Sequence, residues 1–251
     1  MGIVNTQAIV LRYTDFKEAD RVLTLFSPNL GKLQAVARGC RRPKSRLLAA
    51  TQLFCYGDYI LYKGTDMYIV SQADVKQSFY EIRNDVEKFA YATYLLNLTE
   101  EAVNAGEGNP RLFYLLLHML NYLCYSDMNP DDMIHIFEIK LIDLLGYRPL
   151  LSNCIKCGGE LKRKVQFDFD EGGVVCSNCY KLNNNGYTIQ MGTLRTMEKV
   201  LDMDVRRMNV LKFPQEVRKE LDEVLHRYLE IRLDKRLKSR FFIEQMKQKK
   251  E

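Results

Sequence analysis

Two Cys-x-x-Cys pairs constrain this chain more than any other feature of its sequence. The four cysteines are Cys154, Cys157, Cys176 and Cys179. The intervening residues 158–175 have the length usual for a structural zinc site, in which each pair places two sulfurs on one tetrahedral ion. The spacing therefore predicts one Zn²⁺ ion held by four thiolates. Such a closed shell makes the site structural rather than catalytic.

Three alternatives for these cysteines stay open. A redox centre needs only one Cys-x-x-Cys pair, an iron–sulfur cluster also takes four thiolates, and a catalytic zinc usually recruits histidine or a carboxylate. The chain has seven cysteines, an odd number, which with the pairing indicates metal binding in a reducing cytoplasm rather than disulfides. Cys40, Cys55 and Cys124 are expected to be core or incidental thiols rather than metal ligands.

The net charge of the chain is unevenly distributed. The whole sequence carries +5, whereas residues 1–80 carry +5, residues 81–150 carry −6 and residues 151–251 carry +6. Basic side chains are densest in residues 31–50, where no acidic residue occurs. They are Lys32, Arg38, Arg41, Arg42, Lys44 and Arg46. A localised basic surface of this kind favours binding to a polyanion.

Residues 1–80 predict a β-rich domain. Five segments combine β-branched, aromatic and aliphatic residues, and turn signals such as Ser27-Pro28-Asn29-Leu30-Gly31 separate them. The expected strands are Ile3–Arg12, Arg21–Phe26, Leu33–Arg38, Gln52–Tyr62 and Met67–Lys76. Five short strands suit a small closed barrel of the OB type, and a small open sheet packed on a helix is the alternative.

From about residue 82 the hydrophobic period becomes helical. Asn109-Pro110 and Asn129-Pro130 each provide an N-cap followed by proline at the first helical position, and Gly146 marks a C-terminal end. Helical periodicity returns at Leu194–Met203 and again from Pro214 to about Met246, where we expect two helices or one bent helix.

These patterns together predict an α+β multidomain protein. A small N-terminal β-barrel is followed by an all-α domain, into which a four-cysteine zinc module is inserted. The expected parts are residues 1–80 for the barrel, 81–149 for the first part of the helical domain, 150–187 for the zinc module and 188–251 for the rest of the helical domain.

The basic segment predicts a nucleic-acid surface on the barrel. Residues 37–46 leave the third expected strand as a loop, and arginines and lysines on such a loop can follow a phosphate backbone. We expect these side chains, with Lys32, to hold DNA by its phosphates without reading sequence. The aromatic residues on neighbouring strands are either stacking faces or barrel core. They are Phe54, Tyr59, Tyr62 and Tyr68.

Sequence signatures of enzymes are absent. No P-loop, dinucleotide-binding glycine motif, HExxH or GxSxG occurs. His135 with Glu138 has the spacing of a helical metal-ligand pair, but no second copy accompanies it. The acidic group Asp168, Asp170 and Glu171 is expected to form a hairpin turn rather than a nuclease centre. We therefore expect a protein that is not an enzyme.

No membrane segment is predicted. The most apolar run, Tyr114 to Tyr125, is too short to span a bilayer, and the N-terminus lacks the charge and apolar pattern of a signal peptide. Met1-Gly2 with Thr6 fits a loose myristoylation pattern, but the segment from Ile3 to Leu11 is better explained as the first strand.

Two groups of short motifs occur in this chain. The N-terminal group consists of Glu18-Ala19-Asp20-Arg21, Gly31-Lys32, Ala37-Arg38-Gly39, Arg41-Arg42 and Ser45. The central group consists of Phe137-Glu138, then Leu144-Leu145-Gly146-Tyr147-Arg148-Pro149, followed by Cys154 and Cys157. On these motifs the chain resembles the RecO family of bacterial recombination mediators, and the resemblance extends to about residue 235.

This resemblance implies an OB-fold, a helical domain and an inserted zinc module. It also implies a non-enzymatic activity in the bacterial cytoplasm, at the nucleoid: binding single- and double-stranded DNA, annealing complementary strands and working with RecR. Together such proteins let RecA replace single-strand binding protein on DNA. The acidic, aromatic-ended tail of single-strand binding protein then requires an apolar pocket with a basic rim on the helical domain. Arg111, Lys140 and Arg148 are the candidate rim residues.

Two other classes of function are weighed against this one. The first is a zinc-stabilised interaction module of transcription or translation that binds RNA. The second is a hydrolase acting on nucleic acid, which the missing carboxylate or histidine constellation disfavours.

Overall fold

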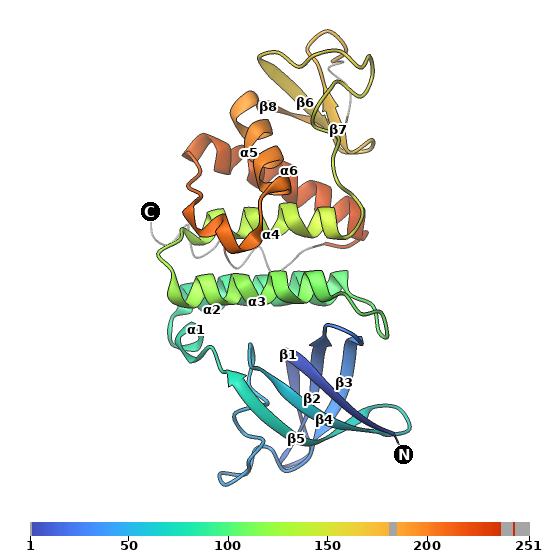
Figure 1. The fold of residues 1–251 in the computed structure, drawn as a ribbon, viewed down its shortest axis with the longest axis vertical. Helices are drawn as coiled ribbons and strands as arrows, with labels where there is room; N and C mark the ends of the chain where they lie inside the picture. Colours follow the sequence, from blue (N-terminus) through green and yellow to red (C-terminus); the bar gives the residue numbers. More distant parts are fainter. Residues whose placement is uncertain (1, 181–184, 237–242, 244–251) are drawn as a thin grey trace. The chain divides into compact units, whose positions relative to one another are not determined.

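In the computed structural model the described residues are 2–180, 185–236 and 243. The chain divides after Tyr125 into two units. One comprises Met1–Tyr125 with Ser239–Glu251, and the other comprises Ser126–Lys238. Figure 1 shows the barrel and its helices in the first unit and a helical layer with a small sheet in the second. The expected division into four parts stays a prediction.

The first unit begins with a closed five-stranded barrel. Its strands are β1 (Ile3–Phe16), β2 (Asp20–Ser27), β3 (Gly31–Ala37), β4 (Tyr56–Lys63) and β5 (Tyr68–Gln77). The order is β1-β2-β3-β5-β4, and β4 pairs back onto β1. All pairs are antiparallel except β3 with β5, which closes the barrel in parallel. The barrel prediction is confirmed, and the open sheet was the wrong alternative.

Alternation of side chains gives strand β3 one face that is directed at the barrel core. Along β3 the residues alternate between buried and more exposed positions, as a strand with one face on a core requires. The barrel core contains Leu23, Leu25, Leu33, Tyr59 and Leu61, together with the expected core thiols Cys40 and Cys55. Within it the Tyr59 hydroxyl donates to the Ala50 carbonyl at 2.8 Å, so its one polar group is satisfied.

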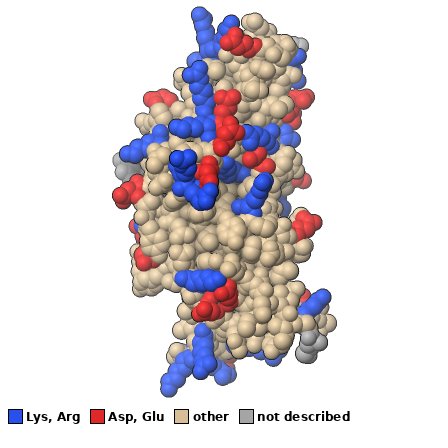
Figure 2. Space-filling model, in the orientation of Figure 1, with Lys and Arg blue, Asp and Glu red and all other residues tan. Residues whose placement is uncertain are grey.

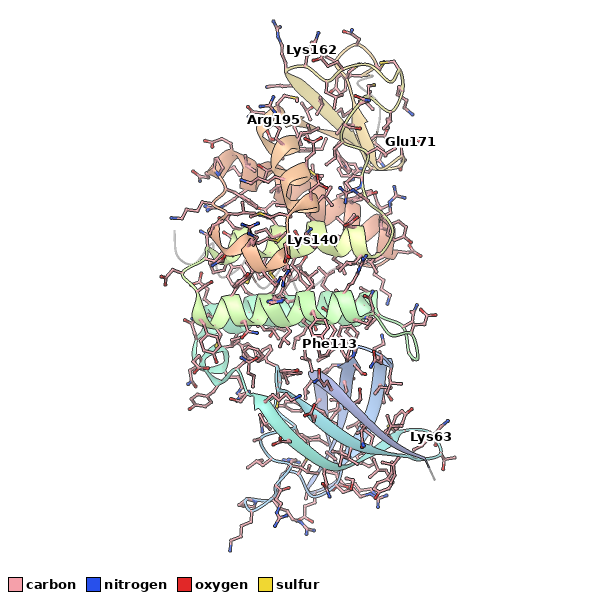
Figure 3. All side chains as sticks on the ribbon, in the orientation of Figure 1. Lys63, Phe113, Lys140, Lys162, Glu171 and Arg195 are labelled. Carbon is pink, nitrogen blue, oxygen red and sulfur yellow. The ribbon has the colours of Figure 1, made fainter. Side chains whose placement is uncertain are left out.

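Three helices complete the first unit: α1 (Tyr80–Asn84), α2 (Val86–Ala102) and α3 (Pro110–Tyr125). Asp85 caps α2 by accepting from the N–H groups of Glu87 and Lys88, and Asn109 accepts from Leu112 at the predicted start of α3. Phe113 points from α3 toward the barrel (Figure 3), where its ring lies 5.6 Å from that of Phe26 in an edge contact.

A tight seam joins the barrel to these helices at the start of β3. Gly31 has a positive φ of 66°, and a Cβ there would lie 2.4 Å from the carbonyl oxygen of Glu107. The neighbouring Lys32 donates its N–H to the Asn104 carbonyl at 3.1 Å. Only glycine permits this approach of two backbones, so the turn between β2 and β3 packs directly on the chain that follows α2.

The second unit contains α4 (Pro130–Leu144), α5 (Met191–Asp202), a 3₁₀ helix η1 (Val205–Val210) and α6 (Gln215–Leu233). The predicted start of α4 is confirmed, because the Asn129 side chain accepts from Asp131 N–H and proline occupies the first turn. Asp132, in the same turn, is fully buried and forms two hydrogen bonds with Arg218 of α6, at 2.6 and 3.0 Å.

A small antiparallel sheet lies between α4 and α5 in the sequence. Its strands are β6 (Lys164–Asp168), β7 (Gly173–Val175) and β8 (Gly186–Gln190), in the order β7-β6-β8. Because β8 pairs with β6 along its whole length, the sheet extends to Gln190. The boundary expected from the sequence, residue 187, falls inside β8.

The C-terminal helical expectation is met in part. Helix α6 ends at Leu233, where Asp234 has a left-handed backbone. The expected continuation toward Met246 lies almost entirely outside the described residues. Among the helices that are described, none has the length and apolar character needed to cross a membrane.

Candidate nucleic-acid interface and metal centre

The basic loop (residues 38–46) is tied to the hairpin between β1 and β2. The Asp20 carboxylate accepts a hydrogen bond from Gly39 N–H at 2.7 Å, and the Arg41 N–H donates to the Ala19 carbonyl at 3.0 Å. Gly39 has a positive φ of 61°, a conformation that glycine adopts readily. These bonds hold the beginning of the loop against the barrel.

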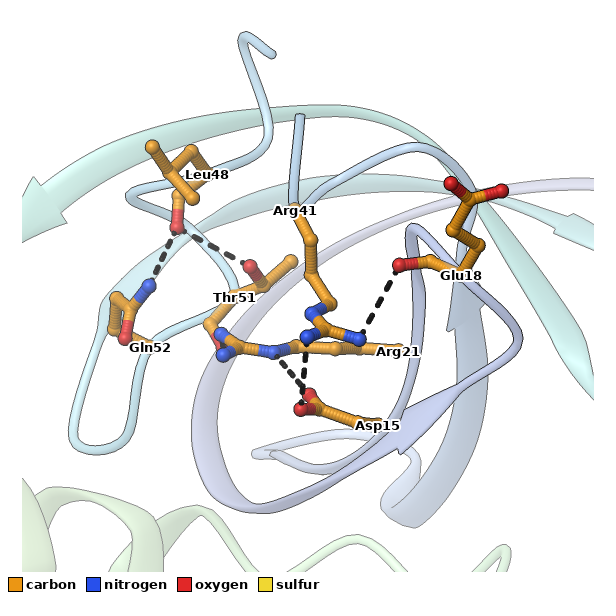
Figure 4. A network of polar contacts seen from close by, with 7 residues as sticks. All are labelled: Asp15, Glu18, Arg21, Arg41, Leu48, Thr51 and Gln52. Carbon is orange, nitrogen blue, oxygen red and sulfur yellow. Dashed lines mark hydrogen bonds and ion pairs between the residues drawn. The ribbon is translucent and has the colours of Figure 1, made fainter. Parts of the chain in front are cut away.

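Arg41 is itself part of this attachment. Its guanidinium donates to the Glu18 carbonyl at 3.3 Å and lies 3.5 Å from the Asp15 carboxylate (Figure 4). Asp15 also pairs with Arg21 at 3.0 Å, and Arg21 donates to the Thr51 carbonyl at 3.2 Å. One carboxylate thus serves two arginines, so the charge of Arg41 is partly neutralised at the mouth of the barrel.

The other predicted DNA-binding side chains of the loop are exposed. They are Arg38, Arg42, Lys44 and Arg46. Among the described residues none of them forms an ion pair. Figure 2 shows Lys and Arg side chains projecting from the end of the barrel that is lowest in the view. The structure therefore brings together five of the six predicted residues and leaves four of them free to meet an anion.

Lys32 is not part of this group. It lies at the start of β3, whereas the basic loop follows the end of that strand. Its ammonium donates to the Glu100 carbonyl at 2.8 Å, in the last turn of α2. A cation at this position satisfies a terminal carbonyl and complements the helix dipole. The role of Lys32 in the structure is to join the barrel to α2.

The aromatic residues divide between core and surface. Phe54 and Tyr59 are fully buried, Tyr68 is partly buried against the barrel core, and Tyr62 is exposed. The first two are therefore core residues rather than stacking faces. The residues that sequence reasoning did not single out are Asp15 and Asp20, whose carboxylates hold the loop. Asp20 stands in the quoted motif Glu18-Ala19-Asp20-Arg21, whereas no quoted motif includes Asp15.

The four paired cysteines form one cluster. Their sulfurs all lie within 4.8 Å of one another, and among the described residues this is the group of metal-ligating side chains that can hold an ion. The first pair turns through Gly158, whose N–H donates to the Cys154 carbonyl at 2.8 Å, and Cys179 N–H donates to Cys176 at 3.0 Å. The Ile155 N–H bonds Val174 of β7, which attaches the first turn to the sheet.

Hydrogen bonds already favour a thiolate in this cluster. Burial acts to raise the pKa of Cys154, but backbone N–H groups of Cys176, Cys157 and Lys156 bond its sulfur and lower the pKa to about 6. In Cys179, bonds to the thiols of Cys157 and Cys176 raise the pKa to about 12.

The donor set fits a single tetrahedral ion. Metal–sulfur bonds of about 2.3 Å in a tetrahedron place sulfurs about 3.8 Å apart, and the Cys157 and Cys176 sulfurs lie 3.8 Å apart. A four-iron cluster would hold its cysteine sulfurs further apart, because iron and sulfide lie between them. The residues present can therefore hold one metal ion in a closed shell of thiolates.

The other candidate sites of the sequence have structural explanations. Asp168 accepts from the N–H groups of Asp170 and Glu171, so this acidic group forms the predicted turn between β6 and β7. His135 is buried and its Nε2 pairs with Asp222 of α6 at 2.9 Å. Within the described residues neither group assembles into a metal-binding cluster.

The candidate rim residues lie in different surroundings. Arg111 is exposed on α3 of the first unit, whereas Lys140 and Arg148 belong to the second. Lys140 donates to the Leu201 carbonyl at 2.7 Å, and burial lowers its pKa. Arg148 pairs with Asp202 at 2.5 Å. The two basic groups of the second unit thus both bond residues at the end of α5.

Comparison with known proteins adds the family. Residues 1–79 match the family Recombination protein O N terminal, and residues 83–241 match Recombination protein O C terminal. The DNA repair protein RecO of Acetivibrio thermocellus is 37% identical over 235 residues, which is 94% of each chain. That of Symbiobacterium thermophilum is 34% identical over 250 residues, covering 98% of this chain and 99% of the relative.

The order of elements agrees with these matches. The N-terminal match covers the five-stranded barrel, and the C-terminal match covers the helices and the four cysteines. The family expected from the sequence motifs is therefore confirmed. The chain belongs to the RecO family of DNA repair proteins.

Proposed function

We propose that the chain is a non-enzymatic DNA-binding recombination mediator. The observation that carries the proposal is the basic loop, which presents four exposed basic side chains and is held to the barrel through Asp20 and Arg41. A loop already ordered in this way loses less conformational entropy when it binds a phosphate backbone. Relatives that share nearly its whole length are called DNA repair proteins.

The loop binds phosphates without reading sequence. Arg38, Arg42, Lys44 and Arg46 are long, exposed cations, and such contacts position a strand but do not distinguish bases. A surface that neutralises two strands lowers their mutual repulsion and raises their local concentration. Annealing of complementary strands then needs no catalytic side chain, in agreement with the non-enzymatic role.

The proposed partners are those that the resemblance to the RecO family implies. With RecR, the protein helps RecA load onto DNA coated by single-strand binding protein, whose acidic tail it binds. Of the three candidate rim residues, Arg111 is exposed and forms no ion pair with another described residue, whereas Lys140 and Arg148 bond groups at the end of α5. The resident ion of the four-cysteine centre is Zn²⁺, which supplies folding free energy to the module and takes no part in chemistry.

Strand annealing on DNA coated with single-strand binding protein, with and without RecR, tests the proposal. Single-strand affinity is measured alongside it as a function of salt. Four phosphate contacts predict a slope of log K against log salt of about −3. Replacing Arg42 and Arg46 by Ala should slow annealing and flatten the slope by about 1.4. The matched control, Lys63→Ala with Lys76→Ala, removes the same charge from β4 and β5. It should change neither the rate of annealing nor the salt slope.

If the slope of log K against log salt were unchanged in the Arg42 and Arg46 variant, the basic loop would not be the DNA-binding surface. The same titration with an RNA of identical sequence distinguishes the alternative, an RNA-binding module. Preference for RNA together with absence of annealing would favour that alternative.

A further inference from the structure

An exposed aromatic ring lies beside the basic loop. Phe16 is the last residue of β1, and its side chain is 43% exposed. Its Cα partner across the hairpin is Asp20, the residue whose carboxylate binds Gly39 N–H. A row across the end of the barrel therefore runs from Phe16 through Asp20 to the first residues of the loop.

The pleat of β1 directs Phe16 away from the barrel core. Tyr13 packs against the core, and successive side chains of a strand point to opposite faces, so Thr14 and Phe16 lie on the outer face. The next row inward on that face joins Thr14 to Val22 and Val22 to Val36. Both valines are partly exposed, so Phe16 stands at the edge of a partly apolar strip.

Two exposed cations belong to this end of the barrel. The ammonium of Lys17 is 5.3 Å from the centroid of Phe16, and Arg38 directly precedes Gly39, the residue bonded to Asp20. Arg38 and Lys17 are both exposed. An apolar face with cations around it matches the two parts of a nucleotide, a flat base and a charged phosphate.

We propose that Phe16 is a stacking platform for an unpaired base, which makes this surface select single-stranded nucleic acid over duplex. The inference rests on the proposed function of the basic loop and adds the class of substrate. Phosphate contacts alone are available to single strands and duplexes alike. An aromatic platform is available only to a base whose face is free, because bases inside a duplex are stacked on each other.

A tryptophan at this position provides a direct test. The chain contains no tryptophan, so Phe16→Trp introduces a single indole fluorophore at the ring. An oligothymidine strand should quench its emission, while a duplex of equal length and an abasic strand of equal charge should leave it nearly unchanged. The control is Tyr62→Trp. Tyr62 is an exposed residue of β4 that pairs with Ile3, at the end of β1 far from Phe16 and the basic loop, so oligothymidine should cause no quenching there.

A second variant measures the contribution to affinity. Phe16→Ala should weaken single-strand binding about 5- to 100-fold, as expected for one lost stack, with the salt slope and the duplex affinity unchanged. Tyr62→Ala, another exposed aromatic of the barrel, should bind like the parent protein. Circular dichroism and thermal unfolding of both variants verify that the barrel is intact.

Two failures are distinguishable. If the parent protein does not bind DNA, or binds without dependence on the basic loop, the proposed function fails. If the parent binds through the loop but Phe16→Ala keeps full single-strand affinity, or Phe16→Trp responds equally to duplex and abasic strands, the stacking platform is overturned and the loop is unaffected.

Discussion

The carboxylate of Asp20 accepts a hydrogen bond from the backbone N–H of Gly39, at 2.7 Å. This bond joins the start of β2 to the start of the basic loop, which lies nineteen positions later in the chain. An acidic residue therefore holds a basic surface in place without neutralising its exposed arginines. The relationship explains how a run of like charges stays ordered next to the barrel.

Replacing Asp20 by Ala should weaken DNA binding even though it removes a negative charge. The variant loses a charge-assisted hydrogen bond, which we expect to lower the free energy of unfolding by about 1–2 kcal/mol and to release the loop. Asp20→Asn keeps a hydrogen-bond acceptor, so it should lose less stability and less DNA affinity than Asp20→Ala. Urea unfolding and single-strand titration by fluorescence anisotropy measure the two effects.

Asp58→Ala is the matched control for that variant. Asp58 pairs with Lys76 at 2.8 Å on the barrel surface, so its loss changes the net charge equally but leaves the loop attached. Its DNA affinity should be unchanged or slightly higher. If Asp20→Ala gained affinity to the same extent, the loop would not depend on Asp20 for its binding geometry.

Lys32→Met should lower stability and leave DNA binding alone. The methionine keeps most of the apolar stem but loses the ammonium that bonds Glu100, so we expect a loss of about 1 kcal/mol. The slope of log K against log salt should equal that of the parent protein. A flatter slope would return Lys32 to the DNA-binding set expected from the sequence.

Cys157→Ser should abolish metal binding with little change to the packed core, because Cys157 is exposed. Metal analysis should give one zinc per chain for the parent protein and none for the variant. Hydrogen exchange should report lost protection in β6, β7 and β8, since structural zinc contributes folding free energy of roughly 10 kcal/mol. Cys124→Ser, at a thiol outside the cluster, should retain zinc, and retention by Cys157→Ser would contradict a four-thiolate site.

Arg218→Met should strongly destabilise the second unit. It leaves the fully buried carboxylate of Asp132 without its two guanidinium bonds, at an expected cost of about 3 kcal/mol. Adding Asp132→Asn should recover part of the loss. Arg206→Met breaks only the exposed ion pair with Asp204. It should lower the free energy of unfolding by less than about 1 kcal/mol, as is usual for ion pairs on the surface.

The features that follow local rules were predictable from the sequence. Asn109 and Asn129 cap helices at the expected residues, because an N-cap and a following proline act within one turn. The cysteine cluster was predictable because two short turns of fixed spacing suffice to bring the sulfurs together. The number and length of the strands indicated a small barrel, but closure was settled against an open sheet only by the pairing of β4 with β1 and of β3 with β5.

Long-range packing explains the rest. Lys32 belongs to the same basic run as Arg38, but the length of β3 separates them, and only the position of α2 determines that Lys32 bonds Glu100. Likewise Asp132 has the sequence signature of a dipole-complementing residue, yet its partner is Arg218 of a distant helix. Strand β8 was missed because its five residues pair with β6, which lies earlier in the chain.

The close packing at Gly31 limits where chimeras between related proteins can be joined. The two family matches meet between residues 79 and 83, but Gly31 admits no Cβ against Glu107, and Phe26 packs on Phe113. A barrel transplanted from a relative at the family boundary would meet a foreign α2–α3 surface. The barrel and its three helices thus pack as one unit, so a chimera with a relative should be better tolerated when it is joined near residue 125 than near residue 80.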